Sequence, residues 1–131
     1  MACILNLETS TTNCSVALSL NGELLILKED NSAKYSHAER LHLYIDAVLK
    51  ETQTEFSQID AIAVSKGPGS YTGLRIGVSA AKGLCFGLDI PLISLPTLEV
   101  LAHKIQIEEG SIVATLDARR MEVYSAVFDA N

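Results

Sequence analysis

The chain has 131 residues, 48% of them hydrophobic and 20% charged, which is typical of a folded globular protein and excludes a disordered one. Its 16 Asp and Glu outnumber its 10 Lys and Arg, and the formal net charge of -6 argues against direct, high-affinity nucleic-acid binding. No apolar run approaches the about 18 residues of a membrane span, and we find no signal peptide, so we expect a cytoplasmic protein with no membrane contact.

The N-terminal segment predicts three short strands joined by tight connections. Apolar runs over 3–7 and 14–20 flank a polar turn, and Asn21-Gly22 leads into a third strand over 23–28. Asn-Gly between two apolar runs favours a hairpin, because both residues tolerate positive φ. We therefore expect these three strands to pair antiparallel.

Downstream, helical and extended patterns alternate. We expect Thr97 to cap the third helix. The first helix places five apolar residues on one face at helical spacing, which we expect in the core: Ala38, Leu41, Ile45, Val48 and Leu49. The expected elements are helices over 37–51, 72–88 and 97–104 and strands over 59–65, 90–95, 111–116 and 122–128. The order βββαβαβα plus a C-terminal β-hairpin predicts an α/β fold. We expect a mixed five-stranded sheet with helices on its faces, whose 59–65 and 90–95 strands join in parallel.

Residues 4–19 and 113–128 share a layout of strand, acidic residue, polar turn and strand. Glu8 and Asp117 occupy the same place in it, although so short a match leaves chance as an alternative. If the match is a duplication, residues 1–110 form one lobe and 111–131 begin a second. We expect the edges of that last hairpin to be unpaired, disordered, folded onto the first sheet or exchanged with another chain.

A glycine-rich segment, KGPGSYTGLRIG at 66–77, lies between a predicted strand and the 72–88 helix. Backbone N–H groups at such a helix start can bind phosphate, but the spacing matches neither the P-loop nor the dinucleotide fingerprint. We favour a tight turn that lets the helix lie close to the sheet. The alternative is a vestigial nucleotide or anion loop, with carboxylates that could hold hydrated Mg²⁺. Its members would be Glu8, Gly67, Gly69, Ser70, Thr72, Gly73 and Asp117.

Metal and covalent chemistry receive no support from the spacing of the reactive side chains. His37 and His42 are five residues apart, whereas two zinc ligands on one helix face must be four apart. No nucleophile-elbow motif surrounds Ser70, and no cysteine has a histidine at a diagnostic spacing. We expect no bound metal, no catalytic residue and no catalytic role for His103. The three cysteines are expected to be reduced and mostly buried.

The helix over 72–88 is apolar on nearly every side, with a polar arc limited to Arg75, Ser79 and Lys82. Such a helix is usually covered on two sides, by the sheet and by a neighbour. A small apolar patch lies on the outward side of the first helix. Either the first and third helices cover this helix completely, or the two apolar surfaces form a partner interface. The residues of that interface would be Leu43, Ala47, Leu74, Val78, Ala81 and Cys85.

The segment AIAVSKGPGSYTGLRIG at 61–77 resembles the signature of the bacterial TsaB (YeaZ) family. The opening strand and Thr/Ser turn in ILNLETSTTNCSVAL at 4–18 resemble the same family, as do IPLISLPTLEVLA at 90–102 and TLDARRMEVYSAVF at 115–128. The resemblance covers nearly the whole chain, but it extends only over the N-terminal lobe and the start of the second lobe of that family. Glu8 stands where many relatives have Asp.

The resemblance implies an ASKHA fold (actin/Hsp70/sugar-kinase-like, related to ribonuclease H). It also implies a non-catalytic scaffold that supports a TsaD-like catalytic subunit in making threonylcarbamoyladenosine next to the tRNA anticodon. A TsaE-like ATPase would be the third member. No cofactor is expected for this chain alone, although ATP and Mg²⁺ could bind in the complex. The metal-binding histidine pair of TsaD has no counterpart in PTLEVLAH at 96–103.

Two hypotheses therefore remain. In the first, the chain is a scaffold subunit without catalysis of its own, a homodimer when alone, and without direct high-affinity tRNA binding. In the second, it is a metal-dependent ASKHA-type nucleotide hydrolase that uses Glu8, Asp117 and the glycine-rich loop. The older description of such proteins as glycoprotease-like M22 peptidase homologues finds neither a nucleophile nor a metal site in these residues.

Overall fold

Three N-terminal strands form an antiparallel meander: β1 (Cys3–Glu8), β2 (Cys14–Leu20) and β3 (Glu23–Asp30). We describe them in a computed structural model, which defines residues 1–31 and 37–130. Asn21 and Gly22 connect β2 to β3 with φ angles of 53° and 82°, as a type I′ turn requires. The predicted hairpin is confirmed.

Two further strands extend the meander into a five-stranded mixed sheet of order β3-β2-β1-β4-β5. Strand β4 (Ala61–Ser65) pairs parallel to β1, and β5 (Leu92–Leu95) pairs parallel to β4. This is the predicted topology, although both strands begin two residues later than expected. All of β4 is buried, as is typical of a central parallel strand.

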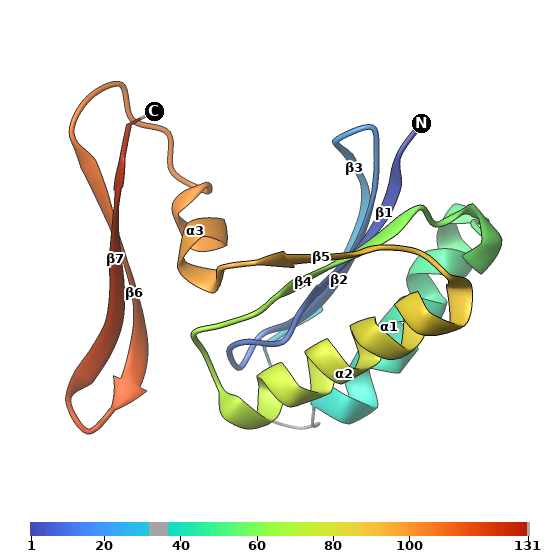
Figure 1. Cartoon of the computed structure of the whole chain (residues 1–131), viewed down its shortest axis with the longest axis horizontal. Coiled ribbons are helices and arrows are strands. Elements are labelled where there is room, and N and C mark those ends of the chain that lie inside the picture. The colour runs from blue at the N-terminus through green and yellow to red at the C-terminus, as the bar shows by residue number, and fades with distance from the viewer. Residues whose placement is uncertain (32–36, 131) are drawn as a thin grey trace.

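The two long helices, α1 (His37–Thr52) and α2 (Tyr71–Leu88), lie together on one face of the sheet (Figure 1). Helix α1 packs on β2 and β3, and α2 packs on β4. Alternate residues of β1 and β2 point toward these helices and are fully or nearly buried, so the main core lies between this face and the helices. Ala38 was expected in that core but is exposed, because it falls on the edge of the buried face of α1.

The remaining helices are short. The 3-10 helix η1 (Phe56–Gln58) precedes β4 and is closed by a reciprocal capping box between Glu55 and Gln58. Helix α3 (Thr97–Ala102) ends earlier than predicted. The expected cap at Thr97 is wrong, because Pro96 occupies the N-cap position and Thr97 is the first helical residue. The buried hydroxyl of Thr97 has no hydrogen-bond partner.

Strands β6 (Ser111–Arg119) and β7 (Glu122–Asp129) form a separate antiparallel hairpin. In Figure 1 this hairpin stands apart from the five-stranded sheet, with α3 between them. A second, smaller core joins them, in which the side chains of Leu98, Ala102 and Ala114 are buried. Helix α3 therefore packs against the hairpin, across the boundary at residue 110 that the sequence predicts. No helix among the described residues is long and apolar enough to cross a membrane.

Candidate functional site

The carboxylate of Glu8, at the end of β1, is held by its neighbours. Its Oε1 accepts a hydrogen bond from the backbone N–H of Ser10 at 2.8 Å, and the Ser10 hydroxyl donates to the same oxygen. The hydroxyl of Ser65, at the end of β4, donates to Oε2. Both carboxylate oxygens therefore already accept hydrogen bonds within the protein, which opposes their use as free ligands for Mg²⁺.

The glycine-rich segment meets the turn after β1 at very short range. Ser70 caps α2 by accepting a hydrogen bond from the N–H of Gly73 at 3.2 Å, and its own N–H donates to the Ser10 carbonyl at 2.7 Å. The Thr9 hydroxyl donates to the Gly73 carbonyl at 2.7 Å and is buried. The start of α2 and the 9–10 turn are thus bonded directly to each other.

Three glycines make this approach possible. A Cβ at Gly69 would lie 2.5 Å from the Ser10 carbonyl oxygen, and one at Gly73 would lie 2.1 Å from the carbonyl oxygen of Thr9. A Cβ at Gly77 would lie 2.2 Å from the Thr9 hydroxyl oxygen. The protein's own chain therefore occupies the space in front of these glycines, which is what the tight-turn interpretation requires. Gly67, at a φ of 116°, supplies the bend that precedes α2.

A second polar cluster fixes the same turn from the side of α1. His37 places Nε2 2.5 Å from the Thr11 carbonyl oxygen, and its Nδ1 lies 3.3 Å from an Arg40 nitrogen. The Arg40 guanidinium is buried and donates to the carbonyls of Asp30 at 2.8 Å and Thr12 at 3.4 Å. Sequence reasoning missed this role, because Arg40 stands beside the core residues of α1 in a pattern that predicts a solvent-exposed cation.

Asp117 is not part of this arrangement. It lies on the hairpin, and its Oδ1 accepts a hydrogen bond from the N–H of Arg119 at 2.8 Å. Among the residues that the structure defines, no three His, Cys, Asp or Glu side chains are grouped as metal ligands. The structure therefore brings Glu8, Gly69, Ser70 and Gly73 together and gives Asp117 a local role in its own turn.

The expected partner interface divides into exposed and buried residues. Leu43 is 68% exposed, whereas Ala81 and Cys85 are 0% and 9% exposed and belong to the main core. Placing Ala81 and Cys85 on an outward surface is therefore wrong, because they lie on the side of α2 that faces the sheet. Of the predicted residues, Leu43, Ala47, Leu74 and Val78 remain outside the buried core. With the exposed Tyr71 and Phe86 of α2, we call this set the helix face.

The helix face mixes exposed apolar side chains with the charged Arg75 and Lys82, which lie between Tyr71 and Phe86 around α2. Tyr71 and Phe86 are 76% and 92% exposed, while Ala47, Leu74 and Val78 are half-buried. Sequence reasoning missed Tyr71 and Phe86, although aromatic residues on the outward side of a helix are a common sign of an interface. Arg75 lies 5.6 Å from the Tyr71 ring centre, in a cation–π arrangement.

The three cysteines are buried and unpaired, as predicted. Burial raises the pKa of each thiol above the ordinary value of 9.0. At Cys3 the Asp60 carboxylate raises the pKa further, and at Cys14 the Arg40 guanidinium opposes part of the effect of burial. These thiols are therefore poor nucleophiles at neutral pH.

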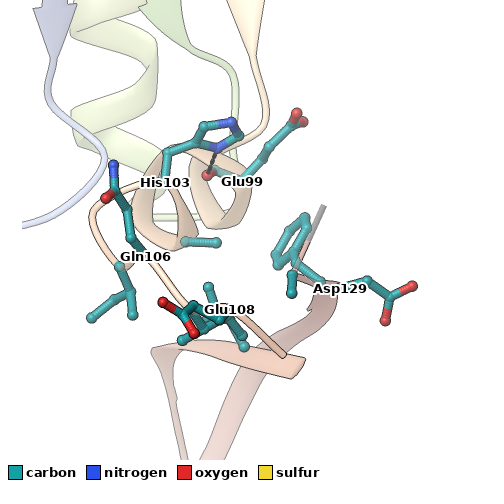
Figure 2. A pocket seen from close by; sticks show the side chains of 11 residues that line it. Glu99, His103, Gln106, Glu108 and Asp129 are labelled. Atoms are coloured by element: carbon teal, nitrogen blue, oxygen red, sulfur yellow. Dashed lines mark hydrogen bonds between the residues drawn. The ribbon is translucent and has the colours of Figure 1, made fainter. Parts of the chain in front are cut away.

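A cavity of about 810 Å³ opens between α3, the segment after it and the ends of β6 and β7 (Figure 2). The lining residues Ala102, Ile112 and Phe128 are apolar, whereas Glu99, Glu108 and Asp129 bring carboxylates to it. The imidazole of His103 is 2.8 Å from the Glu99 carbonyl oxygen and has no acidic partner there. Sequence reasoning missed this cavity, because it depends on how α3 packs on the hairpin.

The family model for TsaD, tRNA N6-adenosine threonylcarbamoyltransferase, matches residues 30–130. The chain is 40% identical to the tRNA threonylcarbamoyladenosine biosynthesis protein TsaB of Haemophilus influenzae over 123 residues, which cover 92% of this chain and 51% of that protein. It is 35% identical to TsaB of Escherichia coli, covering 95% of this chain and 54% of that one. The chain thus spans about half the length of the curated relatives that it matches.

Solved structures agree with this similarity. YeaZ from Pseudomonas aeruginosa superimposes with a TM-score of 0.89 at 35% identity, covering 98% of this chain and 61% of the YeaZ chain. Thermus thermophilus RuvC in complex with a Holliday junction matches with a TM-score of 0.52 at 13% identity, covering 76% of this chain and 68% of the RuvC chain. At that identity, the RuvC match shows a common fold only.

Proposed function

The chain belongs to the TsaB (YeaZ) group of the family that the TsaD model describes, and we propose that it is a non-catalytic scaffold that binds a TsaD-like subunit. The process it would serve is the formation of threonylcarbamoyladenosine in tRNA, for which its curated relatives are named. A TsaE-like ATPase would join the assembly, which would be cytoplasmic.

The observation that carries the proposal is the contrast between the glycine-rich segment and the helix face. The glycines hold α2 against the 9–10 turn, and Thr9 and Ser10 occupy the space in front of Gly69, Gly73 and Gly77. On the other side of the same helix, apolar side chains remain exposed. Burying one Leu or Val side chain is worth about 1.5–3 kcal/mol, so a few such anchors can support a specific complex.

A TsaD-like subunit is a fitting partner because the TsaD model matches this chain over 101 residues, which implies corresponding helices in both proteins. Two related helix pairs can pack against each other as a four-helix interface. Without that partner, the helix face would pair with the helix face of a second copy, giving a two-fold homodimer. Direct tRNA binding by this chain alone stays disfavoured by its net charge of -6.

The substitution Leu43→Glu tests the proposal. Leu43 is 68% exposed, so a glutamate there is tolerated in the free chain but would be buried without a counter-ion in the complex. We expect calorimetry with the TsaD-like subunit to show binding weakened by at least about tenfold. Leu24→Glu is the matched control, since Leu24 is 61% exposed on β3, and it should bind like the unmodified chain.

Equal affinities of the two variants for the TsaD-like subunit would contradict the proposed interface. A titration of the isolated chain with Mg-ATP distinguishes the scaffold proposal from the alternative of a nucleotide hydrolase. Binding at micromolar concentration would support a nucleotide hydrolase of the ASKHA type, whereas the scaffold proposal predicts no binding in that range.

A further inference from the structure

The outward side of α2 carries a stripe of aromatic, cationic and apolar side chains. Positions three or four apart lie on the same side of a helix, because a helix has about 3.6 residues per turn. Five residues of α2 follow this spacing, and we call them the α2 stripe: Tyr71, Arg75, Val78, Lys82 and Phe86. All except the half-buried Val78 are exposed. The stripe therefore runs along nearly the whole of α2 as one surface.

The α2 stripe is positive on a chain that is negative as a whole. Helix α2 contains Arg75 and Lys82 but no Asp or Glu, whereas the chain has a net charge of -6. Neither cation forms an ion pair within residues 1–31 and 37–130. The guanidinium of Arg75 lies over the Tyr71 ring, an arrangement in which arginine can still donate to a carboxylate. A partner that covers the stripe therefore binds best if it supplies carboxylates.

A second α2 stripe cannot supply those carboxylates. An antiparallel pairing of two stripes about their centre places Arg75 opposite the partner's Lys82, and the two-fold axis repeats this contact. A parallel pairing places each cation beside its own copy. Because the stripe holds no acidic residue, no register of two stripes brings a carboxylate opposite a cation. Like charges that face each other oppose such a pairing.

The neighbouring helix α1 does not solve this problem, because its carboxylates are already engaged. Asp46 pairs with Lys50 at 2.8 Å, and Glu51 pairs with Lys28 at 2.7 Å. Glu39 likewise has an interaction of its own. Recruiting these side chains to the cations of a second copy would break existing contacts, so self-pairing gains little from them.

We propose that the α2 stripe selects an acidic helical surface, so that carboxylates of the TsaD-like subunit pair with Arg75 and Lys82 while Tyr71 and Phe86 pack around them. This inference rests on the proposed scaffold function and adds the chemistry of the partner to it. Aromatic residues and arginine are enriched where interfaces bind most tightly. Complementary charge raises the rate of association and suppresses wrong partners. The stripe therefore favours the heteromeric complex over the homodimer.

Nucleic acid is the other class of partner that cations beside aromatic rings can bind, through phosphate contacts and base stacking. Two cations on a chain with a net charge of -6 provide little attraction for phosphates. An acidic protein surface is therefore the better match, and tRNA binding is measured beside it in the test.

Neutralising the two cations tests the inference. Arg75→Gln with Lys82→Gln removes both charges but keeps polar side chains at exposed positions, so the fold is preserved. In surface plasmon resonance with the TsaD-like subunit, we expect the dissociation constant to rise by about tenfold, with slower association and a weaker dependence on salt. Lys104→Gln with Arg120→Gln is the matched control. It removes the same charge from exposed positions outside α1 and α2 and should bind like the unmodified chain.

Self-association should respond in the opposite direction. Without like charges on facing helices, the neutralised variant should form homodimers at lower concentrations than the unmodified chain in sedimentation equilibrium, whereas the control should not. Damage to the fold of α2 would weaken both complexes. Opposite shifts therefore distinguish selection by charge from a structural defect.

Two results would overturn the inference. In the first, the neutralised variant and its control bind the TsaD-like subunit equally while Leu43→Glu still weakens binding; the scaffold proposal then stands without a role for the charges. In the second, fluorescence anisotropy shows that the neutralised variant loses tRNA binding while its affinity for the TsaD-like subunit is unchanged, which assigns the cations to nucleic acid. Equal binding by all variants, Leu43→Glu included, would overturn the scaffold proposal as well.

Discussion

The chain contains two hairpins whose turns both contain positive φ angles, but the two hairpins have very different surroundings. In the β2–β3 hairpin, the turn residues Asn21 and Gly22 have positive φ, which both tolerate. In the β6–β7 hairpin, Arg119, Arg120 and Met121 all have positive φ, between 56° and 65°, although none of these residue types favours that conformation. The first turn is encoded locally, whereas the second has no such local support.

Their neighbours differ as well. The β2–β3 hairpin is extended by β1 and β4 and covered by α1, while β6–β7 is covered by the short helix α3 alone. The two segments that share a strand, an acidic residue and a turn also differ in strand pairing. Glu8 pairs with Ser15, seven residues later, whereas Asp117 pairs with Val123, six residues later. We infer that the five-stranded lobe supplies most of the stability and the hairpin supplies an adaptable surface.

The largest effect is expected where α2 meets the 9–10 turn. Gly73→Ala places a methyl group where the Thr9 carbonyl oxygen lies 2.1 Å away, so the helix must move outward. We expect the free energy of unfolding to fall by about 3 kcal/mol, measured by urea denaturation. Gly83→Ala, where a Cβ meets nothing within 4 Å, should stabilise by up to about 1 kcal/mol. Similar losses for both variants would contradict the packing role of Gly73.

A smaller effect of opposite sign is expected at the second turn. Met121 has a φ of 62° and is fully exposed, so Met121→Gly relieves backbone strain without removing a contact. We expect the free energy of opening of the β6–β7 hairpin to rise by about 1 kcal/mol, measured from hydrogen exchange of its amides. The reciprocal Gly22→Ala should destabilise the first hairpin by a similar amount, and an unchanged exchange rate in both would show that turn strain does not distinguish them.

The smallest effect concerns pH and is confined to the five-stranded lobe, which holds all three buried thiols. Burial raises their pKa in the folded state above 9.0. Below that pH the thiols are neutral in both states; above it the unfolded chain loses protons first, so the free energy of unfolding falls as pH rises. Urea denaturation at about pH 8 and pH 10 should show that the free energy of unfolding falls more for this chain than for its triple Cys→Ala variant. An equal fall in both proteins would contradict a contribution from the buried thiols.

The five-stranded topology could be predicted because its signals are local. Asn21-Gly22 marks a hairpin, and the glycines before α2 mark a close helix-to-sheet approach. The helix face could be predicted only in part. Ala81 and Cys85 lie on an apolar strip of α2 that continues into the core, and sequence periodicity does not tell which side of such a helix meets the sheet.

The α3 region was less accessible to prediction. Whether α3 packs on the first sheet or on the hairpin depends on contacts between distant segments, such as that of Leu98 with Ala114. The same holds for the cavity that these segments enclose and for the burial of Arg40, whose partners lie at the end of β3 and in the turn after β1. No local pattern encodes these contacts.

The most direct test of the scaffold proposal is hydrogen exchange of the full chain with and without the TsaD-like subunit. The proposal predicts new protection on α1 and α2 around Leu43 and Val78, while the amides of β6 and β7 exchange as before. Protection on the hairpin with none on α1 and α2 would contradict it.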